Sequence, residues 1–394
     1  MTRLAYIVSH PIQYQAPLLR RLAAERDLDL QVLFLSDFST RAYRDRGFGQ
    51  SVAWDVDLVQ GYPSKVLPAA GRRDIVSFWK PLTLNVGAEL RRGRYDAVWL
   101  HGYAHHAQLR ALVAARRLGM KVLLRGESHA HATRESMIPA PVKRRVLMRL
   151  FTQIDAFLAI GTANRDYYLS YGVEPDRIFM MPYAVDNARF QAASTLEHGL
   201  ALRASLGLPA SRPIILFAAK LQPRKRAWDL WTAYTRLSPD GVTEPHPALI
   251  FVGDGSQRSA LEAAVAQKGW SGVRFAGFQN QTAMPRFYAA ADVFVLCSEN
   301  EPWALAVNEA MNAGTAVIVS DQVGAAPDLV QDGVNGFVVP VGDVATLANR
   351  LRRVTTDEAL ARRMGAQSLQ RISRWNFEAD VAGLRQALAM AGSN

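Results

Sequence analysis

The chain has 394 residues, of which 49% are hydrophobic and 21% are charged, and its formal net charge is +11. This length predicts two or three domains with an ample core, and the composition excludes a disordered chain and a disulfide-rich scaffold. Cys297, as the one cysteine, excludes an intrachain disulfide, and no run approaches the ~20 apolar residues of a membrane span. The apolar stretch of MTRLAYIVSHP is too short for a signal peptide, so we expect a cytoplasmic protein.

The positive charge is concentrated in the first half of the chain. Up to Phe190 there are 27 Lys and Arg against 17 Asp and Glu, whereas the remainder has 19 and 18. A basic half predicts an anionic partner, such as a membrane surface, a phosphorylated lipid or an anionic glycan. Nucleic acid would also fit the charge, but the aromatic and basic residues are not interleaved as in a recognised RNA module, so we expect no nucleic-acid partner.

Short apolar runs alternate with helical segments through the whole chain. Strands are expected at 4–8, 30–35, 97–100, 121–124, 156–160, 177–181, 213–219, 248–252, 273–276, 293–297 and 315–320, and helices at 16–26, 81–92, 162–171, 304–313, 344–353 and 358–372. Short apolar strands between helices predict parallel sheets. The fold class is therefore α/β, with two doubly wound, Rossmann-like domains facing an interdomain cleft. We place the first domain at 1–195 and the second at 205–374.

Polar residues follow the first strand, at the sheet edge where ligands of open α/β folds bind. His10, Gln13 and Tyr14 lie in this loop. They form a natural contact for a second substrate. A plain connection shaped by Pro11 explains them about equally well.

Three histidines occur in the segment His101-Gly-Tyr-Ala-His-His106, after another predicted strand. No Cys, Asp or Glu lies nearby to complete a zinc site, so a polar substrate contact or the start of a helix explains them better. Arg125 and Glu127 follow the next strand and are further candidates on this side, as is His129.

Two other patterns in the first half have ordinary explanations. Asp55-Val-Asp57 matches a metal-binding DxD pattern, but its alternation with apolar neighbours favours a strand with the aspartates facing water, so we assign no metal. The segment 143–151 has cations on one helical face and apolar groups on the other, as in helices that lie on membranes. A surface helix with its apolar side in the core is slightly favoured.

The predicted strand at 213–219 leads into the basic loop Lys220-Leu-Gln-Pro-Arg-Lys225-Arg226. Lys220 and Lys225 lie five residues apart beside a helix that we expect to start near Ala227. Because Lys binds phosphate as a point charge, the pair fits a clamp for a diphosphate. Basic loops are usually just solvated, but the position after a strand favours phosphate binding.

The stretch CSENEPWALAVNEAMNAGTAVIVSDQVGAAPD, residues 297–328, predicts a strand, a loop, a helix and a second strand. Pro302 suits the first turn of the helix, whose N-terminus offers free N–H groups to phosphate or hydroxyls. Glu301 precedes the helix and Glu309 lies inside it. Each alone would be explained as a surface charge, but together they can bracket a polyol such as a sugar or ribose.

The spacing of Glu301 and Glu309 within EPWALAVNEAMNAGTAVIVSD, with Gly314 and the strand after it, resembles the donor-site signature of the retaining glycosyltransferases of family 4. Their fold is GT-B. The resemblance implies that Glu301 contacts the donor sugar and Glu309 the ribose of a nucleotide-sugar. The other donor contacts that it implies are Lys220, Lys225, Gly277, Phe278, Pro302, Trp303, Ala304 and Leu305.

Two positions depart from the family pattern. Ala304 stands where the family usually has Gly, which puts the shape of the donor pocket in question. Lys220 stands for an Arg, so the charge is kept and the bidentate fork is lost. By the same resemblance, His101 falls in the region of the histidine of the family's first domain, and the helix at 375–390 packs back on that domain.

The resemblance implies a metal-independent, retaining hexosyltransferase without a cofactor, in which Glu301, Lys225, Lys220 and His101 act in catalysis. The lysines would stabilise the leaving diphosphate. The sugar would pass to a glycan or phospholipid-linked acceptor held by His10, Gln13, Tyr14, His101, Arg125 and Glu127. Polysaccharide or glycolipid assembly at the inner membrane face, with peripheral contact through the basic domain, would follow. A nucleotide-sugar epimerase or phosphorylase of the same fold, or a non-enzymatic binder of anionic surfaces, is the alternative.

Overall fold

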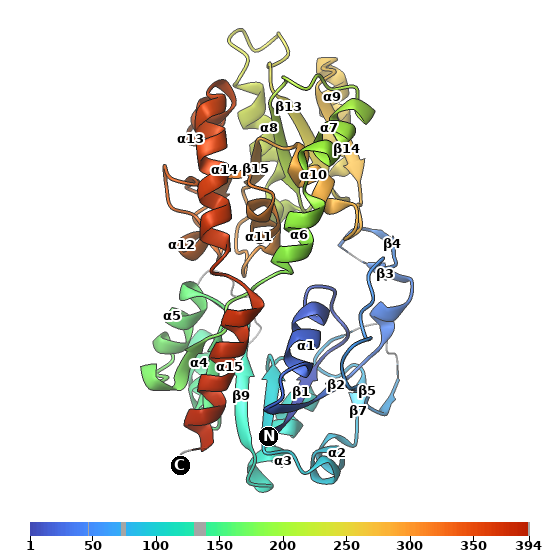
Figure 1. Cartoon of the computed structure of the whole chain (residues 1–394), viewed down its shortest axis with the longest axis vertical. Helices are drawn as coiled ribbons and strands as arrows, with labels where there is room; N and C mark the ends of the chain where they lie inside the picture. Colours follow the sequence, from blue (N-terminus) through green and yellow to red (C-terminus); the bar gives the residue numbers. More distant parts are fainter. Residues whose placement is uncertain (46, 72–75, 130–138, 393–394) are drawn as a thin grey trace. The chain divides into compact units, whose positions relative to one another are not determined.

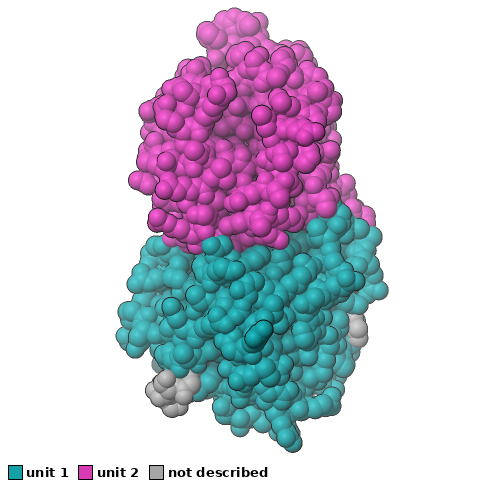
Figure 2. Space-filling model, viewed as in Figure 1, with its two compact units in different colours: residues 1–43, 52–183, 376–394 teal, residues 44–51, 184–375 magenta. Residues whose placement is uncertain are grey.

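The computed structural model describes residues 1–45, 47–71, 76–129 and 139–392 (Figure 1). The chain divides into two compact units, which Figure 2 distinguishes by colour. The first comprises residues 1–43, 52–183 and 376–394, and the second comprises residues 44–51 and 184–375. In this division the chain changes unit between Tyr183 and Ala184, whereas the sequence places the boundary between residues 195 and 205.

The first unit is built on a seven-stranded sheet in the order β11-β10-β9-β8-β1-β2-β5, in which neighbouring strands are parallel. The strands are β1 (Thr2–Val8), β2 (Leu28–Phe34), β5 (Ser64–Val66), β8 (Ala97–His101), β9 (Lys121–Arg125), β10 (Ala156–Ala159) and β11 (Ile178–Met180). All of them except β5 lie at runs that the sequence predicts as strands. The short β5 falls in the weakly patterned segment before residue 80.

Helices cover both faces of this sheet because side chains alternate along each strand. Leu4, Tyr6 and Val8 of β1 pack in one core with α1 (Ala16–Ala23) and α15 (Phe377–Gly392). Ala5 and Ile7 belong to the opposite core. The helices of that face are α2 (Val86–Gly93), α3 (His106–Arg117), α4 (Ala140–Phe151) and α5 (Thr162–Ser170). The last helix of the chain is thus part of the first unit's core.

The second unit has a six-stranded parallel sheet in the order β14-β13-β12-β15-β16-β17. The strands are β12 (Ile214–Ala218), β13 (Ala248–Val252), β14 (Val273–Gly277), β15 (Val293–Leu296), β16 (Ala316–Ser320) and β17 (Gly336–Val339). Every residue of β12, β13, β15 and β16 is buried, as expected of strands covered on both faces. The order reverses between β12 and β15, which makes this the switch point of the sheet.

Nine helices of the second unit surround this sheet in the described part of the chain. They are α6 (Asn187–Ala193), α7 (Leu196–Ser205), α8 (Ala227–Thr235), α9 (Arg258–Lys268), α10 (Met284–Ala290), α11 (Leu305–Asn312), α12 (Ala326–Leu329), α13 (Val344–Thr356) and α14 (Glu358–Ile372). None of the described helices of the protein is long and apolar enough to cross a membrane.

The segment between β2 and α2 differs from the expectation in two places. Residues 53–60 form bends and a turn instead of a strand. The carboxylate of Asp57 accepts hydrogen bonds from the N–H groups of Val59 and Gln60, at 2.9 and 2.8 Å, and these bonds favour a turn. In addition, α2 begins at Val86 instead of residue 81, because β7 (Leu82–Thr83) pairs with β6 (Ala69–Ala70).

Candidate active site

The loops after β12 and β15 meet at the switch point of the second unit. Residues 219–226 form the first loop and residues 297–304 the second. The backbone N–H of Glu299 donates to the carbonyl of Arg224 at 2.8 Å, which ties the loops together. At Gly253, after the adjacent β13, an added Cβ would lie 2.1 Å from the carbonyl oxygen of Ala219, so only glycine permits this close approach.

Two cations of the first loop converge on one carboxylate of the second. Nζ of Lys225 pairs with Oε2 of Glu301, and Nη1 of Arg224 lies 3.0 Å from the same oxygen. Lys225 and Glu301 are buried, whereas the side chain of Arg224 is 45% exposed. Burial lowers the pKa of Lys225, and the charge of Glu301 opposes that effect. Lys225 and Glu301 are predicted for this site from the sequence, whereas Arg224 is not, although it lies in the same basic loop.

The backbone of Glu301 is fixed by the loop that follows β16. Its N–H donates to the carbonyl of Gln322 at 3.1 Å, and its own carbonyl accepts from the N–H of Gly324 at 2.9 Å. Both backbone polar groups of Glu301 are therefore hydrogen-bonded, which fixes the position from which its side chain extends. This arrangement suits a group that orients a ligand hydroxyl.

Ala304 stands immediately before α11 with a φ of 84°, in the left-handed region. This conformation favours glycine because it brings the Cβ of other residues too close to the backbone. Pro302 and Leu305, its predicted companions at the donor site, are half-buried. Trp303 is buried, and its Nε1 donates to Oδ1 of Asn308 at 2.9 Å, so the indole is part of the packing of α11.

Glu309 lies on α11 and contacts a different element from Glu301. The hydroxyl of Tyr288, on α10, donates to Oε2 of Glu309 at 2.7 Å. Burial raises the pKa of Glu309 to about 7, while the Tyr288 hydroxyl and the charge of Arg189 act in the opposite direction. Tyr288 is a second residue that the sequence analysis misses, because no local pattern connects it with α11.

Gly277 and Phe278 lie at the end of β14, and Lys220 lies at the end of β12. The ring of Phe278 packs edge to face against that of Phe48, with 4.8 Å between centroids. Nζ of Lys220 lies 2.8 and 3.0 Å from the two carboxylate oxygens of Asp45. Asp45 and Phe48 come from the residues 44–51 that the second unit takes from the first half of the chain, and sequence spacing gives no signal for them.

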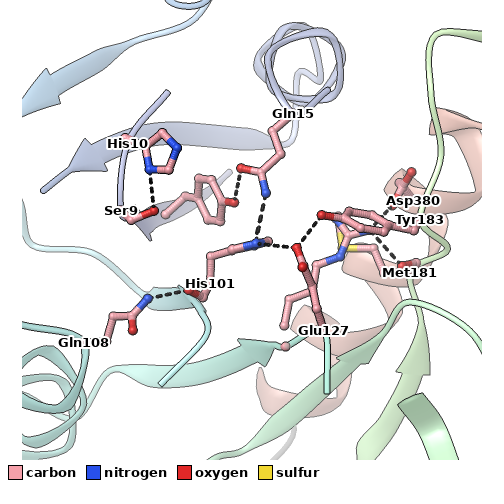
Figure 3. Close-up of polar contacts among 12 residues, drawn as sticks. Ser9, His10, Gln15, His101, Gln108, Glu127, Met181, Tyr183 and Asp380 are labelled. Atoms are coloured by element: carbon pink, nitrogen blue, oxygen red, sulfur yellow. Dashed lines mark hydrogen bonds and ion pairs between the residues drawn. The ribbon is translucent and has the colours of Figure 1, made fainter. Parts of the chain in front are cut away.

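In the first unit, a polar network joins the ends of β8 and β9 (Figure 3). Nε2 of His101 lies 3.0 Å from Nε2 of Gln15 and 3.5 Å from Oε1 of Glu127. The hydroxyl of Tyr183 donates to the same Glu127 oxygen. Burial raises the pKa of Glu127, but hydrogen bonds to His101 and Tyr183 and the charge of Arg125 outweigh it, so the pKa is lowered. The network thus presents an ionised carboxylate beside an imidazole.

Of the other residues predicted for this side, His10 and Tyr14 lie close to the network. His10 contacts Oγ of Ser9 at 2.9 Å, and burial followed by the charge of His101 lowers its pKa to about 4. The ring of Tyr14 packs edge to face on that of Tyr183, at 5.5 Å. Gln13 is half-buried in the same turn, and His129 is buried.

Arg125 serves the fold. Its side chain is 1% exposed, and Nη2 donates to the carbonyls of Met181 and Pro182 and to Asp380. The guanidinium that the sequence predicts for acceptor binding is thus buried, with Nη2 in contact with these three partners.

The histidines of the segment 101–106 have separate functions. Nδ1 of His105 accepts from the N–H of Ala107 at 3.0 Å and caps α3, which is the helix start proposed for this segment. His106 contacts the carbonyl of Phe78 instead. Among the described residues no group of three or more His, Cys, Asp or Glu side chains is placed to hold a metal ion.

Comparisons with known structures define the class of fold. The structure of Anabaena Alr3699/HepE in complex with UDP superimposes with a TM-score of 0.73 at 19% identity, over 99% of this chain and 100% of that chain. Sucrose-phosphate synthase from Thermosynechococcus elongatus gives 0.75 at 21% identity over the full length of both chains. The protein therefore has a GT-B fold, with two Rossmann-like units.

Sequence comparisons relate part of the chain to a family. Residues 200–371 match the family model described as "Glycosyl transferases group 1". D-inositol 3-phosphate glycosyltransferase from Streptomyces bingchenggensis is 31% identical over 56% of this chain and 49% of that protein, and the lipopolysaccharide core biosynthesis glycosyltransferase LpsE from Rhizobium meliloti is 32% identical over 48% and 53%. The matches span about half the length of these curated relatives. Residues 200–371, which lie within the second unit, are therefore similar to the group 1 glycosyltransferases.

Proposed function

We propose that the protein is a retaining, metal-independent glycosyltransferase that moves a hexose from a nucleoside diphosphate sugar to a glycan or lipid-linked acceptor. The observation that carries the proposal is the convergence of Lys225 and Arg224 on Glu301 at the switch point of a parallel sheet. Ligands of open α/β folds bind at such points. The match of residues 200–371 to the glycosyltransferase family supports the same conclusion.

The chemistry follows from charge. When the bond between the anomeric carbon and the diphosphate breaks, negative charge grows on the leaving phosphate oxygens. Lys220, Arg224 and Lys225 supply fixed positive charge there, and such preorganised charge is worth most where water is excluded. Glu301 would accept a hydrogen bond from a sugar hydroxyl, and Glu309 from the ribose. Retention would proceed with the leaving phosphate assisting the attacking acceptor hydroxyl.

The donor can be identified by ligand binding followed by turnover. We would measure thermal stabilisation by UDP, GDP, ADP and TDP in EDTA, because a ligand that binds only the folded state raises its stability. UDP is the first choice, since UDP and UDP-glucose are bound in Anabaena HepE. The corresponding nucleotide-sugar should then release its nucleoside diphosphate, faster with acceptor present. Absence of stabilisation by every nucleotide would contradict the proposal.

Product analysis separates this reaction from those of other GT-B enzymes. A retaining transferase gives a new glycoside whose anomeric configuration is that of the donor, which proton NMR reports. An epimerase would return an isomeric sugar without an acceptor, and a phosphorylase would require inorganic phosphate. Either result would replace the proposed reaction.

A basic and apolar surface on α4 supports a peripheral membrane contact for the first unit. Val142, Val146 and Met148 are 52%, 59% and 40% exposed, whereas Leu147 and Phe151 face the core. Arg144, Arg145 and Arg149 are exposed on the same helix. The apolar side of α4 is therefore only partly buried, unlike that of the ordinary surface helix favoured from sequence. Such a helix binds anionic lipid by inserting apolar side chains below a basic rim.

Vesicle sedimentation tests this contact. The protein should bind phosphatidylglycerol vesicles and leave pure phosphatidylcholine vesicles unbound, and binding should fall as NaCl screens the charges. The double variant Val142→Ser/Val146→Ser should weaken binding, whereas Leu196→Ser, at an exposed apolar position of the second unit, should not. Equal binding by both variants would contradict the assignment of α4.

A further inference from the structure

The hairpin formed by β3 (Tyr43–Asp45) and β4 (Gln50–Val52) belongs largely to a different unit from the chain that flanks it. Residues 44–51 belong to the second unit, while the chain on either side belongs to the first. The second unit therefore receives eight residues from a distant part of the sequence. The contacts of this segment, which we call the 44–51 hairpin, are made with the loops after β12 and β14.

The first set of contacts holds Lys220. Both carboxylate oxygens of Asp45 lie within 3.0 Å of its Nζ, although 175 residues separate the two positions. Gln222, in the same loop, donates to the carbonyl of Gly47 at 3.1 Å. A Cβ at Gly47 would lie 2.7 Å from Cδ and Nζ of Lys220, so the lysine side chain packs directly on the hairpin backbone.

The second set of contacts involves Phe48. Nζ of Lys220 lies 4.5 Å from the centroid of its ring, and the ring packs edge to face on Phe278. The hairpin thus places an anion on a lysine and an aromatic ring on a second ring. A nucleoside diphosphate offers the same two groups, because phosphates pair with Lys and bases stack on aromatic side chains.

We propose that the 44–51 hairpin occupies the nucleotide site of the ligand-free protein, with Asp45 in place of a phosphate and Phe48 in place of the base. A nucleoside diphosphate then displaces the hairpin by exchanging one anion for another on Lys220. The inference rests on the proposed function, since it uses Lys220 as a phosphate ligand.

The hairpin can leave at low cost because Asp45 has partners within its own turn. Oδ1 accepts from the N–H groups of Gly47 and Phe48 at 2.7 and 3.0 Å, and the N–H of Gly49 donates to the carbonyl of Asp45 at 2.9 Å. These bonds persist when Lys220 is released. Lys225, in contrast, is paired with Glu301 of the loop after β15, so Lys220 is the lysine whose ion pair the hairpin supplies.

The test compares Asp45→Asn with Asp240→Asn by calorimetric titration with inorganic pyrophosphate and with UDP. The Asp45→Asn variant keeps a side-chain oxygen that accepts the hydrogen bonds of the turn. It removes the negative charge that pairs with Lys220. Asp240 accepts backbone hydrogen bonds in an exposed turn of the same unit, so its variant matches the change in net charge. Asp45→Asn should bind both ligands about two- to five-fold more tightly than wild type, the range expected from an ion pair of this exposure. Asp240→Asn should match wild type.

Two further measurements address the ring and the movement. Phe48→Leu should tighten binding of UDP more than binding of pyrophosphate. Weaker UDP binding would mean that Phe48 contacts the bound nucleotide instead of being displaced by it, and would overturn the proposal. Hydrogen exchange of the peptide covering the hairpin should accelerate when pyrophosphate binds, and should be fast in ligand-free Asp45→Asn.

Failure of the hairpin proposal can be distinguished from failure of the proposed function. If Lys220→Met abolishes binding but Asp45→Asn equals wild type or binds more weakly, the hairpin proposal is wrong and the proposed function stands. If neither wild type nor Asp45→Asn binds pyrophosphate or any nucleoside diphosphate, the proposed function is wrong and the hairpin proposal falls with it.

Discussion

Nη2 of Arg125 lies 3.2 Å from Oδ1 of Asp380, although the two residues are 255 positions apart. Both side chains are almost completely buried, at 1% and 0% exposure. Arg125 ends β9 and Asp380 lies in the first turn of α15, so the pair ties the last helix to the first unit's sheet. The end of the chain therefore belongs to the unit in which the chain begins, and the buried Arg125–Asp380 pair holds α15 against the sheet.

Removing one partner of this pair should be strongly destabilising. We expect Asp380→Ala to lower the free energy of unfolding of the first unit by about 3–5 kcal/mol, because it leaves a buried guanidinium without its carboxylate. Urea denaturation measures the change. The control is Arg385→Ala, on the same helix, whose pair with Asp27 is exposed and screened by water, so its removal should cost much less. Equal losses from the two variants would show that α15 does not depend on the buried pair.

The left-handed backbone of Ala304 gives a prediction of opposite sign. Ala304→Gly should raise the free energy of unfolding of the second unit by about 1 kcal/mol, because glycine adopts a φ of 84° without a Cβ clash. The matched control is Ala306→Gly, two residues along in the first turn of α11, which should lower stability by up to roughly 1 kcal/mol because glycine loses more backbone freedom on folding. Thermal unfolding of both variants checks the pair, and loss of stability in both would refute the strain at Ala304.

The sequence was sufficient to predict both parallel sheets except for the edge strands β5 and β17, and to predict the two loops whose side chains meet at Glu301. Apolar runs such as Ile214–Ala218 are recognisable from the sequence as buried strands. A basic loop directly after such a strand lies at the carboxyl edge of a parallel sheet, where ligands bind. Glu301 and Lys225 come together because their strands, β15 and β12, are neighbours.

Long-range pairings were not accessible in this way. Asp45 meets Lys220 across 175 residues, and no periodicity or spacing records that contact. The strand predicted around Asp55 and Asp57 was wrong because of a local side-chain contact. Three alternating apolar residues favour a strand, but a single carboxylate that accepts two backbone N–H groups, as Asp57 does, is enough to make a turn.

The cations around Glu301 should contribute unequally to turnover. Lys225→Met should lower kcat on the order of 100-fold, because a buried charge aimed at the leaving diphosphate acts in a low dielectric. Arg224→Met should cost less, since its side chain is 45% exposed and its charge is screened by water. The control is Lys268→Met, whose ammonium donates to the carbonyl of Gly241 on the surface and should not affect the rate. A Lys225→Met enzyme as active as this control would remove Lys225 from the reaction.

Glu309 should make both stability and donor binding depend on pH. Its pKa in the folded protein, about 7, lies above the ordinary value near 4.5, so the native state holds the proton more tightly than the unfolded state. The contribution of Glu309 to stability is therefore complete below about pH 4.5 and is lost as the pH rises through 7. Glu309→Gln should reduce the fall in melting temperature between pH 5 and pH 8, whereas Glu262→Gln, at a surface ion pair with Arg258, should not.

Binding of UDP should change in the opposite direction over the same pH range. Only the ionised carboxylate of Glu309 offers both oxygens as acceptors to the ribose hydroxyls, so affinity should increase as the pH rises through 7. Calorimetric titrations at pH 6 and pH 8 measure the difference, which Glu309→Gln should abolish. If the wild-type affinity is the same at both values while the melting temperature still follows Glu309, the carboxylate belongs to the packing of α10 and α11 and does not contact the ribose.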